Sequence, residues 1–357
     1  MGNLLQNIFE SILFFILILG LNYFVYYGVL FHFGVYWPYI LLISAIIAAM
    51  FPFSQLVELR KHNSISRIIY IRSAVMLGFT FYLLFLIIVL LVVEAFVTLP
   101  EPLTVILVLI FNTIITVYSI FNALNIKETF VKLSFNELKS PVRIAHISDL
   151  HVGSINTDSF LRKVVQKLNN TGADLVVITG DLGDGSRLIN ENSFEPFKEL
   201  KIPIYFVTGN HDGYSGLNNV YSALNNANVV ILNDRLESVR DDLELIGINF
   251  SVDDNFSEVL KEFPPKNDKL SVLLHHLPTG WDISRKNNVN LQLAGHTHSG
   301  QFYPMNFIVK LIFPYIKGLF NEGDDYLYVS AGTGTWGPPL RSGSSSEIVI
   351  FDLEPKK

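Results

Sequence analysis

The distribution of hydrophobic residues divides the chain into two different halves. Up to about Leu124 the sequence is almost continuously apolar, whereas the remainder alternates short apolar runs with polar segments. A helix that crosses a bilayer needs roughly 20 predominantly apolar residues. Four segments of the first half meet that requirement, and they cover residues 8–31, 36–56, 69–97 and 103–124. We therefore expect an all-α transmembrane bundle of four helices within residues 1–126, followed by a second domain over residues 127–357.

The basic residues of the first half indicate how these segments are oriented. Before Lys127 the only Lys and Arg side chains lie in or beside the connection between the second and third segments, and they are Arg60, Lys61, Arg67 and Arg72. Loops rich in Lys and Arg stay on the cytoplasmic side of a membrane. With four spans, both termini then lie on that side. We predict a multi-pass protein of the cell membrane with a cytoplasmic C-terminal domain.

The second half has the pattern of a layered α/β domain. Its apolar runs are "VRIAHIS", "DLVVITG", "IPIYFVTG", "NVVILN", "LELIGIN", "SVLLHH", "LQLAG", "YLYVSAG" and "EIVIFDL". Several are continuously apolar and rich in Val and Ile, as is typical of strands buried on both faces. Amphipathic stretches at 159–168 and 217–226 separate the early runs and predict helices that cover a sheet. The later runs follow one another more closely, which predicts a second or mixed sheet.

Composition restricts the chemistry of the chain. The net charge of −6 argues against nucleic acid as the main partner, and nothing in the sequence indicates an obligate protein partner. The absence of cysteine excludes disulfides and thiolate metal ligands. Any metal must therefore bind to His, Asp, Asn or Glu, which suits manganese, iron, zinc or magnesium.

Ionisable side chains collect directly after five of the predicted strands. In chain order they are Asp149 and His151, Asp181 and Asp184, Asn210 to Asp212, His275 and His276, and His296 and His298. In open α/β sheets, ligands bind outside the carboxyl ends of the strands. Each of these groups alone is compatible with a surface turn or a packed histidine, but the ordered set predicts one shared metal site.

The spacing within the groups has a structural interpretation. In an extended segment, residues two apart point to the same side, so Asp149 with His151, and His296 with His298, can each present two ligands. The glycines before Asp181, Asn210 and His296 are expected to let the backbone turn sharply off each strand. The set is large enough for two cations about 3.5–4 Å apart, bridged by one carboxylate.

The ordered motifs resemble those of a known superfamily. They are Asp149-x-His151, Gly180-Asp181-x-x-Asp184, Gly209-Asn210-His211-Asp212, His276-x-Pro278 and Gly295-His296-Thr297-His298. This series resembles the calcineurin-like metallophosphoesterases, and Ser299-Gly300-Gln301 with the later "YVSAGTGTWGPPLR" resembles their membrane-associated bacterial branch. The resemblance covers about residues 130–353. It implies a four-layer α/β sandwich and a metal-dependent phosphoester hydrolase with two divalent ions.

The resemblance also implies a role for each motif residue. Asp149, His151 and His298 would hold one metal, and Asn210, His276 and His296 the other, with Asp181 bridging both. A metal-bridged hydroxide would attack phosphorus in line. His211, oriented by Asp184, would assist the leaving group as a general acid.

Three residues have alternative roles. His275 and His276 are adjacent, so strand alternation sends them to opposite faces, and the proline two residues later favours His276 as the ligand. Arg341 either meets the substrate phosphate or forms a surface salt bridge.

A broken apolar run follows the last histidine motif. The run "FYPMNFIVKLIFPYIKGLF" is interrupted by Pro304 and Pro314 and is too short to span a bilayer. It either packs on the domain as a loop or lies on the membrane beside the mouth of the site, where it would admit an amphiphilic substrate.

The combined pattern favours a membrane-anchored hydrolase of phosphodiesters or lipid-linked phosphoesters. A catalytically silent metal-binding scaffold or sensor is the alternative, although such a module would not need His211 and Asp184 beside the ligands. A transporter with an accessory phosphatase domain is disfavoured because the interiors of the spans carry few charges.

Overall fold

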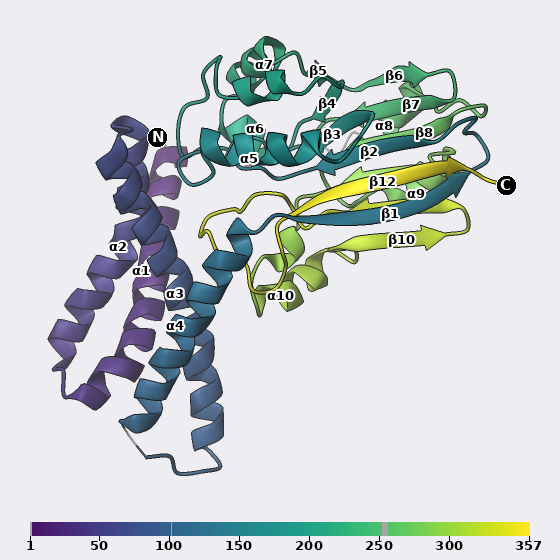
Figure 1. Ribbon diagram of the computed structural model, residues 1–357. Coiled ribbons are helices and arrows are strands. Elements are labelled where there is room, and N and C mark those ends of the chain that lie inside the picture. The colour runs from purple at the N-terminus through teal and green to yellow at the C-terminus, as the bar shows by residue number, and fades with distance from the viewer. Residues whose placement is uncertain (1, 101, 252–255) are drawn as a thin grey trace. The chain divides into compact units, whose positions relative to one another are not determined.

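The computed structural model describes residues 2–100, 102–251 and 256–357 (Figure 1). The chain forms two compact units. One contains the residues up to Ile120 together with the short segment Gly337–Leu340, and the other contains Phe121–Trp336 and Arg341–Lys357.

The first half consists of long helices, as its apolar pattern predicts. They are α1 (Gly2–Leu30), α2 (Trp37–Arg60), α3 (Ser64–Glu94) and α4 (Leu103–Leu124), with a short 3₁₀ turn at Phe31–Phe33. Within the described residues, four helices are long and apolar enough to cross a membrane. Many of their large apolar side chains are exposed, including Phe53 and Phe121. Such side chains are costly in water and suit a hydrocarbon environment.

Small polar side chains join these helices internally. The Tyr26 hydroxyl lies 2.7 Å from Thr80 Oγ1, and Ser54 Oγ lies 2.5 Å from Ser73 Oγ. Between apolar helices in lipid, small residues and hydrogen bonds replace the hydrophobic effect as the source of specific association. At the start of α3 the Asn63 side chain accepts hydrogen bonds from two backbone N–H groups, which forms a capping box.

The second half is built on two six-stranded sheets. The first has the order β1-β12-β2-β3-β4-β5. Its strands are β1 (Lys127–Phe135), β12 (Glu347–Pro355), β2 (Val142–Ile147), β3 (Leu175–Thr179), β4 (Ile204–Val207) and β5 (Val230–Ile231). From β2 to β5 all neighbours are parallel, so their carboxyl ends lie at the same edge. β12 runs antiparallel to β2.

The second sheet has the order β10-β11-β9-β8-β7-β6. Its strands are β10 (Gly318–Glu322), β11 (Asp325–Val329), β9 (Leu291–Ala294), β8 (Leu270–His275), β7 (Leu243–Ile248) and β6 (Arg235–Arg240). The four central strands are parallel, and the two edge strands are antiparallel to them. The apolar runs do not identify β1, β6 or β10, because these edge strands are only partly buried and carry many polar residues.

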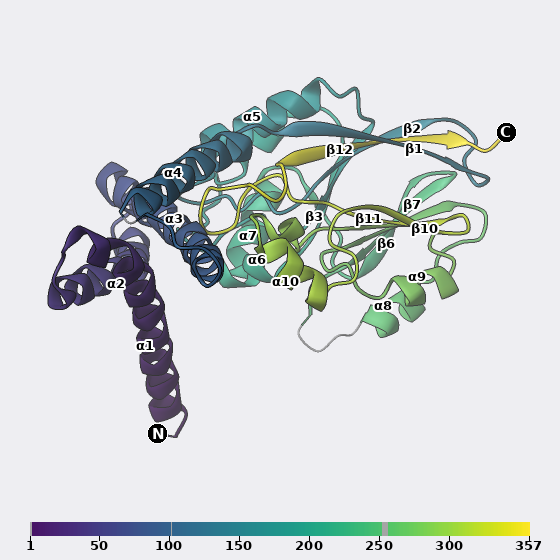
Figure 2. The ribbon, with the colours of Figure 1, turned by 90° about the horizontal axis from the view of Figure 1, so that it is seen from below.

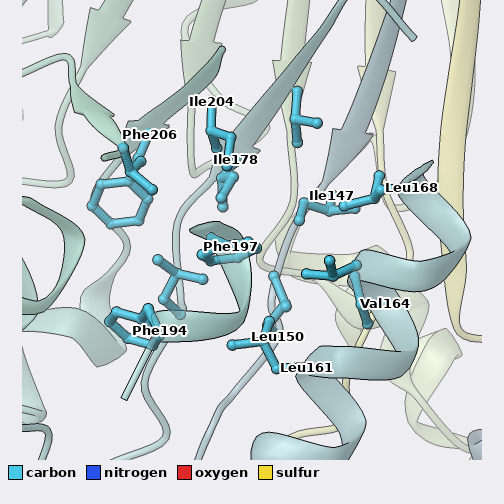
Figure 3. Close-up of a cluster of buried hydrophobic side chains, with 14 of the residues drawn as sticks. Ile147, Leu150, Leu161, Val164, Leu168, Ile178, Phe194, Phe197, Ile204 and Phe206 are labelled. Atoms are coloured by element: carbon cyan, nitrogen blue, oxygen red, sulfur yellow. The ribbon is translucent and has the colours of Figure 1, made fainter. Parts of the chain in front are cut away.

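Helices cover the outer faces of both sheets. The first sheet is covered by α5 (Asp158–Asn169), the 3₁₀ helix η2 (Glu195–Glu199) and α7 (Leu217–Asn226). Figure 3 shows part of this layer, where Leu161 and Val164 of α5 pack with Ile147 of β2. On the second sheet, α8 (Phe256–Glu262) packs against β7 and β8, and α9 (Trp281–Lys286) lies outside β9 and β11 (Figure 2).

A separate apolar cluster fills the space between the two sheets. It includes Ile144 and Val177 from the first sheet and Leu245 and Leu293 from the second. The domain is therefore an α/β/β/α sandwich, in agreement with the predicted four layers. Three short helices lie among the loops that leave the strands, namely α6 (Asn210–Tyr214), η3 (His298–Gly300) and α10 (Met305–Ile312).

Candidate metal centre

The predicted ligand residues come together at the carboxyl ends of five strands. Asp149 and His151 follow β2, and Asp181 follows β3. Asn210 and His211 open α6 after β4, His276 directly follows β8, and His296 and His298 follow β9. All of these side chains are buried or half-buried. The parallel arrangement thus brings residues that are up to about 150 positions apart into one site.

The loops reach this site with an unexpected backbone conformation. Five of the predicted ligands have positive φ angles, namely Asp149 (53°), His151 (48°), Asp181 (55°), His296 (69°) and His298 (47°). The expectation that each Asp-x-His or His-x-His pair is extended is therefore wrong. The loops after β2 and β3 instead hold each other, because the N–H groups of Asp149 and His151 donate to Gly180 and Asp181 carbonyls at 3.0 Å each. Positive φ is rare outside glycine and needs such support from its surroundings.

The glycines that precede the ligands serve mainly to leave space. Of the three, only Gly180 has a left-handed φ, at +88°. A Cβ atom at Gly209 would lie 2.2 Å from Asp181 Oδ1, and one at Gly295 would lie 2.3 Å from Asp149 Oδ2. At Gly209 and Gly295 the expected sharp turn is thus replaced by a different requirement, the close approach of the backbone to a carboxylate.

One group of ligand atoms combines Asp149, His151 and His298, whose atoms lie within 4.8 Å of one another. The Nε2 atoms of His151 and His298 are 3.0 Å apart, and His298 Nε2 lies 3.5 Å from Asp149 Oδ1. Burial raises the pKa of Asp149 to about 6 and lowers the pKa of His151 to about 3. Neutral imidazoles that face each other beside a carboxylate are a suitable donor set for a divalent cation.

A second group combines Asp181, His276 and His296 within the same limit of 4.8 Å. His276 Nε2 lies 3.2 Å from Asp181 Oδ2 and 3.2 Å from His296 Nδ1. His276 Nδ1 is 2.7 Å from the carbonyl oxygen of Thr179, which orients the ring and leaves Nε2 directed to the site.

The charge state of this second group depends on the Asp181–His276 pair. Burial alone would lower the pKa of His276, but the charge and hydrogen bond of Asp181 raise it to about 9. Burial likewise opposes ionisation of Asp181, yet His276 holds the pKa of that carboxyl well below its usual range. Asp181 also forms a ligand group with His151 and His211, so its carboxylate lies between the two sets.

Asn210 and His211 complete the site. Asn210 Oδ1 is buried and has no hydrogen-bond partner within residues 2–100, 102–251 and 256–357, which is costly unless a cation or another donor satisfies it. The backbone N–H of His211 donates to Asp181 Oδ1 at 2.8 Å, and its half-buried ring lines the cavity beside the ligands. Burial lowers the pKa of His211. The unsatisfied amide oxygen and the nitrogen and oxygen donor set therefore fit divalent metal binding.

His275 and His276 do point in opposite directions. His275 Nδ1 lies 3.1 Å from the Ile248 carbonyl oxygen, and its ring packs on Phe256 outside the second sheet. His276 is the member of the pair that lies in the ligand group.

The Asp184 carboxylate has a different contact from the expected one. It accepts hydrogen bonds from the backbone N–H of Ser186 at 2.7 Å and from the Ser186 hydroxyl. The group of Asp184 that acts on His211 is its backbone carbonyl, which opposes the lowering of the His211 pKa by burial. The expected orientation of His211 by this carboxylate is thus corrected, because a local turn already satisfies the carboxylate.

Arg341 also differs from both expectations for it. The side chain is fully buried, so it forms no surface salt bridge. Its Nη2 donates to the Gly334 carbonyl at 2.5 Å and lies 3.2 Å from His298 Nδ1, and Nη1 donates to Ser344 Oγ at 2.7 Å. The guanidinium therefore supports a ligand histidine from behind and is not itself among the residues that line the cavity.

Sequence reasoning missed the structural role of Asp212. Its buried carboxylate accepts hydrogen bonds from four backbone N–H groups, those of Asp181, Leu182, Gly183 and Gly209, at 2.8 to 3.2 Å. Burial and the nearby Asp181 raise the pKa of Asp212 to about 7. Asp212 thus ties the loop after β3 to the loop after β4. Its place in the Gly-Asn-His-Asp motif is visible in sequence, but its backbone partners are not.

The site opens into a cavity of about 280 Å³. Ligand residues and His211 share its lining with an apolar wall that consists of Phe302, Met305, Val309, Phe313 and Trp336. The Gln301 amide fixes Trp336 in place, because it accepts from the Trp336 N–H and donates to the Trp336 carbonyl, both at 2.9 Å. The cavity can therefore hold a charged group at the ligands and an apolar group against the apolar wall.

Comparisons with known proteins agree with this geometry. A sequence model described as calcineurin-like phosphoesterase matches residues 142–300. An uncharacterised metallophosphoesterase of Helicobacter pylori is 34% identical over 245 residues, which cover 65% of this chain and 64% of that protein. One from Campylobacter jejuni is 31% identical over 71% of this chain and 72% of its own length. A transmembrane protein with a metallophosphoesterase domain from Danio rerio is 29% identical over 70% of this chain and 62% of its own length.

The chain thus spans somewhat less than two thirds of the Helicobacter and Danio proteins, and more than two thirds of the Campylobacter one. The matched segment of the family contains every ligand group described above. The chain belongs to the calcineurin-like metallophosphoesterase family.

Proposed function

We propose that this protein is a membrane-anchored phosphoester hydrolase that works with two divalent cations. The observation that carries the proposal is the position of Asp181, whose carboxylate lies between the Asp149–His151–His298 group and the His276–His296 group. A carboxylate shared by two ligand sets is the arrangement that a two-metal centre requires. Asn210 also lines the cavity, and its buried Oδ1, which has no hydrogen-bond partner among the described residues, is proposed as a further donor to the cation at the His276 group.

The chain's own residues divide the work of hydrolysis. When bound, two divalent cations neutralise charge on the phosphoryl group and favour deprotonation of the attacking water. His211 lines the cavity, and its lowered pKa makes its protonated form a stronger acid toward the leaving oxygen. Arg341 and the Thr179 carbonyl hold the rings of His298 and His276 from behind. The ligand histidines are therefore oriented before a substrate arrives.

The proposed substrate is a phosphodiester or a lipid-linked phosphoester. The apolar wall of the cavity supports an organic group on the phosphate, because free inorganic phosphate would leave Phe302, Val309 and Phe313 without a partner. The four apolar helices and the Danio relative support anchoring in a membrane. The basic residues in and beside the connection between α2 and α3 support a cytoplasmic catalytic domain.

Removal of metal provides the direct test. Chelator treatment is expected to abolish hydrolysis of bis-p-nitrophenyl phosphate and of lipid phosphoesters, and manganese, zinc or magnesium should restore it. Metal content is measured in parallel by elemental analysis. Protein that binds metal but shows no turnover on either substrate would instead support the silent scaffold. Turnover that persists after complete metal removal would contradict the proposal.

The pH dependence of metal binding follows from two pKa values of the metal-free site. His276 titrates at about 9 and Asp149 at about 6, and both must be deprotonated to bind a cation. A metal at the His276 group therefore displaces one proton below pH 9, from His276, and a metal at the Asp149 group displaces one proton below pH 6, from Asp149. Affinity is expected to rise about tenfold per pH unit up to pH 9 at the His276 group and up to pH 6 at the Asp149 group.

Calorimetric titration in buffers of different ionisation enthalpy measures this proton release. At pH 7.5 about one proton per site is expected to leave with each bound metal at the His276 group. The same titrations without protein give the contribution of the buffer itself. A binding enthalpy that does not depend on the buffer would contradict the assigned protonation of His276.

A further inference from the structure

Helix α10 exposes large apolar side chains next to the proposed active site. Every residue of this helix, which lies wholly within the described part of the chain, is exposed or half-buried. Met305 and Val309 line the cavity. Phe307, Leu311 and Ile312 are 65%, 87% and 67% exposed. A two-turn helix that is apolar on both sides needs a partner that covers its outer side.

The charge of this segment indicates what that partner is. The run from Phe302 to Phe320 contains no Asp or Glu, and its only charged side chains are Lys310 and Lys317, which are both exposed. Apolar side chains interspersed with lysines are typical of segments that lie at the surface of an anionic bilayer. A symmetric contact with a second copy centred on α10 would bring two Lys310 ammonium groups together, which is unfavourable.

The position of α10 in the fold connects this surface to the cavity. The helix lies in the loop between β9 and β10, outside the two sheets, and begins seven residues after His298 (Figure 1). Its inner side chains, with Phe302 and Phe313, form much of the apolar wall of the cavity that the ligands share. One short helix therefore separates the reactive groups from the exposed apolar surface. The described part of the chain also contains four helices that are suited to a bilayer. A protein anchored by such helices carries α10 on the same chain as its membrane anchor.

We propose that α10 lies in the headgroup and acyl boundary of an anionic bilayer and forms the lip through which an amphiphilic phosphoester enters the cavity. The assignment of the substrate class rests on the proposed hydrolase function, whereas the bilayer contact does not. The phosphoester would face Asp181 and His211, and its apolar part would contact Met305, Val309 and Phe313. Phe307, Leu311 and Ile312 would insert among the lipids.

The natural absence of cysteine makes the bilayer contact directly measurable. Leu311→Cys in the full-length protein is spin-labelled and placed in nanodiscs of phosphatidylcholine and phosphatidylglycerol. Asp241→Cys is the reference, because Asp241 is exposed in the turn before β7, at the end of the strand away from the site. The Leu311 label should be more accessible to dissolved oxygen than to a water-soluble nickel complex, and the Asp241 label should show the reverse.

Two outcomes of this measurement would overturn the proposal. The first is a Leu311 label as accessible to the nickel complex as the Asp241 label. The second is strong spin–spin coupling between Leu311 labels, which would identify a second copy as the partner. Neither outcome depends on catalysis, so the bilayer contact can fail while the hydrolase function stands, and the reverse also holds.

The substrate class is tested with a pair of substitutions on the outer side of α10. Phe307→Ser with Leu311→Ser should lower turnover of a lipid phosphoester in anionic vesicles about tenfold or more, and turnover of bis-p-nitrophenyl phosphate by less than about twofold. Leu188→Ser is the matched control, because Leu188 is also a highly exposed leucine but lies outside the cavity wall. Equal losses on both substrates would exclude α10 as the entry for lipid.

Discussion

Asp181→Asn is expected to lower hydrolysis by about 10³-fold or more, because it removes the carboxylate shared by both proposed metal sites and so loses several kcal/mol of charge stabilisation. Its Oδ2 lies 3.2 Å from His276 Nε2 and 3.8 Å from His151 Nε2, so the substitution reaches both ligand groups at once. Metal content, measured after dialysis against a defined metal concentration, should fall together with activity.

His211→Gln distinguishes loss of metal from loss of proton transfer. His211 lines the cavity and its backbone N–H contacts Asp181, but the proposed ligand sets do not need its ring. The variant should keep its metal and lose about 10²–10⁴-fold in kcat, the usual contribution of a general acid. The loss should be smaller for substrates with good leaving groups, such as p-nitrophenolate, which need no proton.

The outcome that would contradict the first prediction concerns Asp181 itself. An Asp181→Asn protein with full metal content and full activity would refute the bridging role.

Much of the architecture could be predicted because it follows from simple patterns. The apolar length of α1 to α4 exceeds what a soluble domain needs, and the Val-rich and Ile-rich runs at β2 and β3 match strands buried on both faces. Polar residues that follow parallel strands lie at the same edge of the sheet, and this rule was sufficient to predict one shared site for Asp149, Asp181 and His296. These features depend on composition and order, which a sequence states directly.

The remaining features depend on contacts between distant backbone segments. Contacts with distant segments support the left-handed conformations of Asp149 and His298. The Asp149 N–H donates to the Gly180 carbonyl and its carbonyl accepts from the Gly334 N–H, while the His298 carbonyl accepts from the Ser344 hydroxyl. A glycine at position 209 is compatible with a sharp turn and also with a close approach of the backbone to Asp181 Oδ1. The sequence does not distinguish the two, and the structure has the close approach. Arg341 resembles a surface or substrate residue in sequence, but the loop carbonyls of Gly332 and Gly334 and the His298 ring enclose it. Side-chain identity alone does not encode such partners.

The backbone partners of Asp212 likewise could not be predicted from the sequence. They lead to the second large predicted effect, a loss of folding stability. Asp212→Ala is expected to lower the free energy of unfolding by about 4 kcal/mol, because four buried backbone N–H groups lose their acceptor and each unsatisfied group costs about 1–3 kcal/mol before water or relaxation compensates. Thermal and denaturant unfolding of the metal-free protein measures the loss. Metal affinity should fall as well, because Asp181 and Gly209 would no longer be held at their present separation.

Asp174→Ala is the matched control for this prediction. The Asp174 carboxylate also accepts a hydrogen bond from a backbone N–H, that of Arg143 at 2.7 Å. Unlike the hydrogen bonds of Asp212, this one is exposed to solvent. Its removal should cost about 0.5–1.5 kcal/mol, the net value of one hydrogen bond, and leave metal affinity unchanged. If Asp212→Ala were no more destabilising than Asp174→Ala, the two loops would have to be held by their own backbone hydrogen bonds. In that case the carboxylate of Asp212 would act on the metal site through its charge alone, and Asp212→Asn would then change metal affinity as much as Asp212→Ala does.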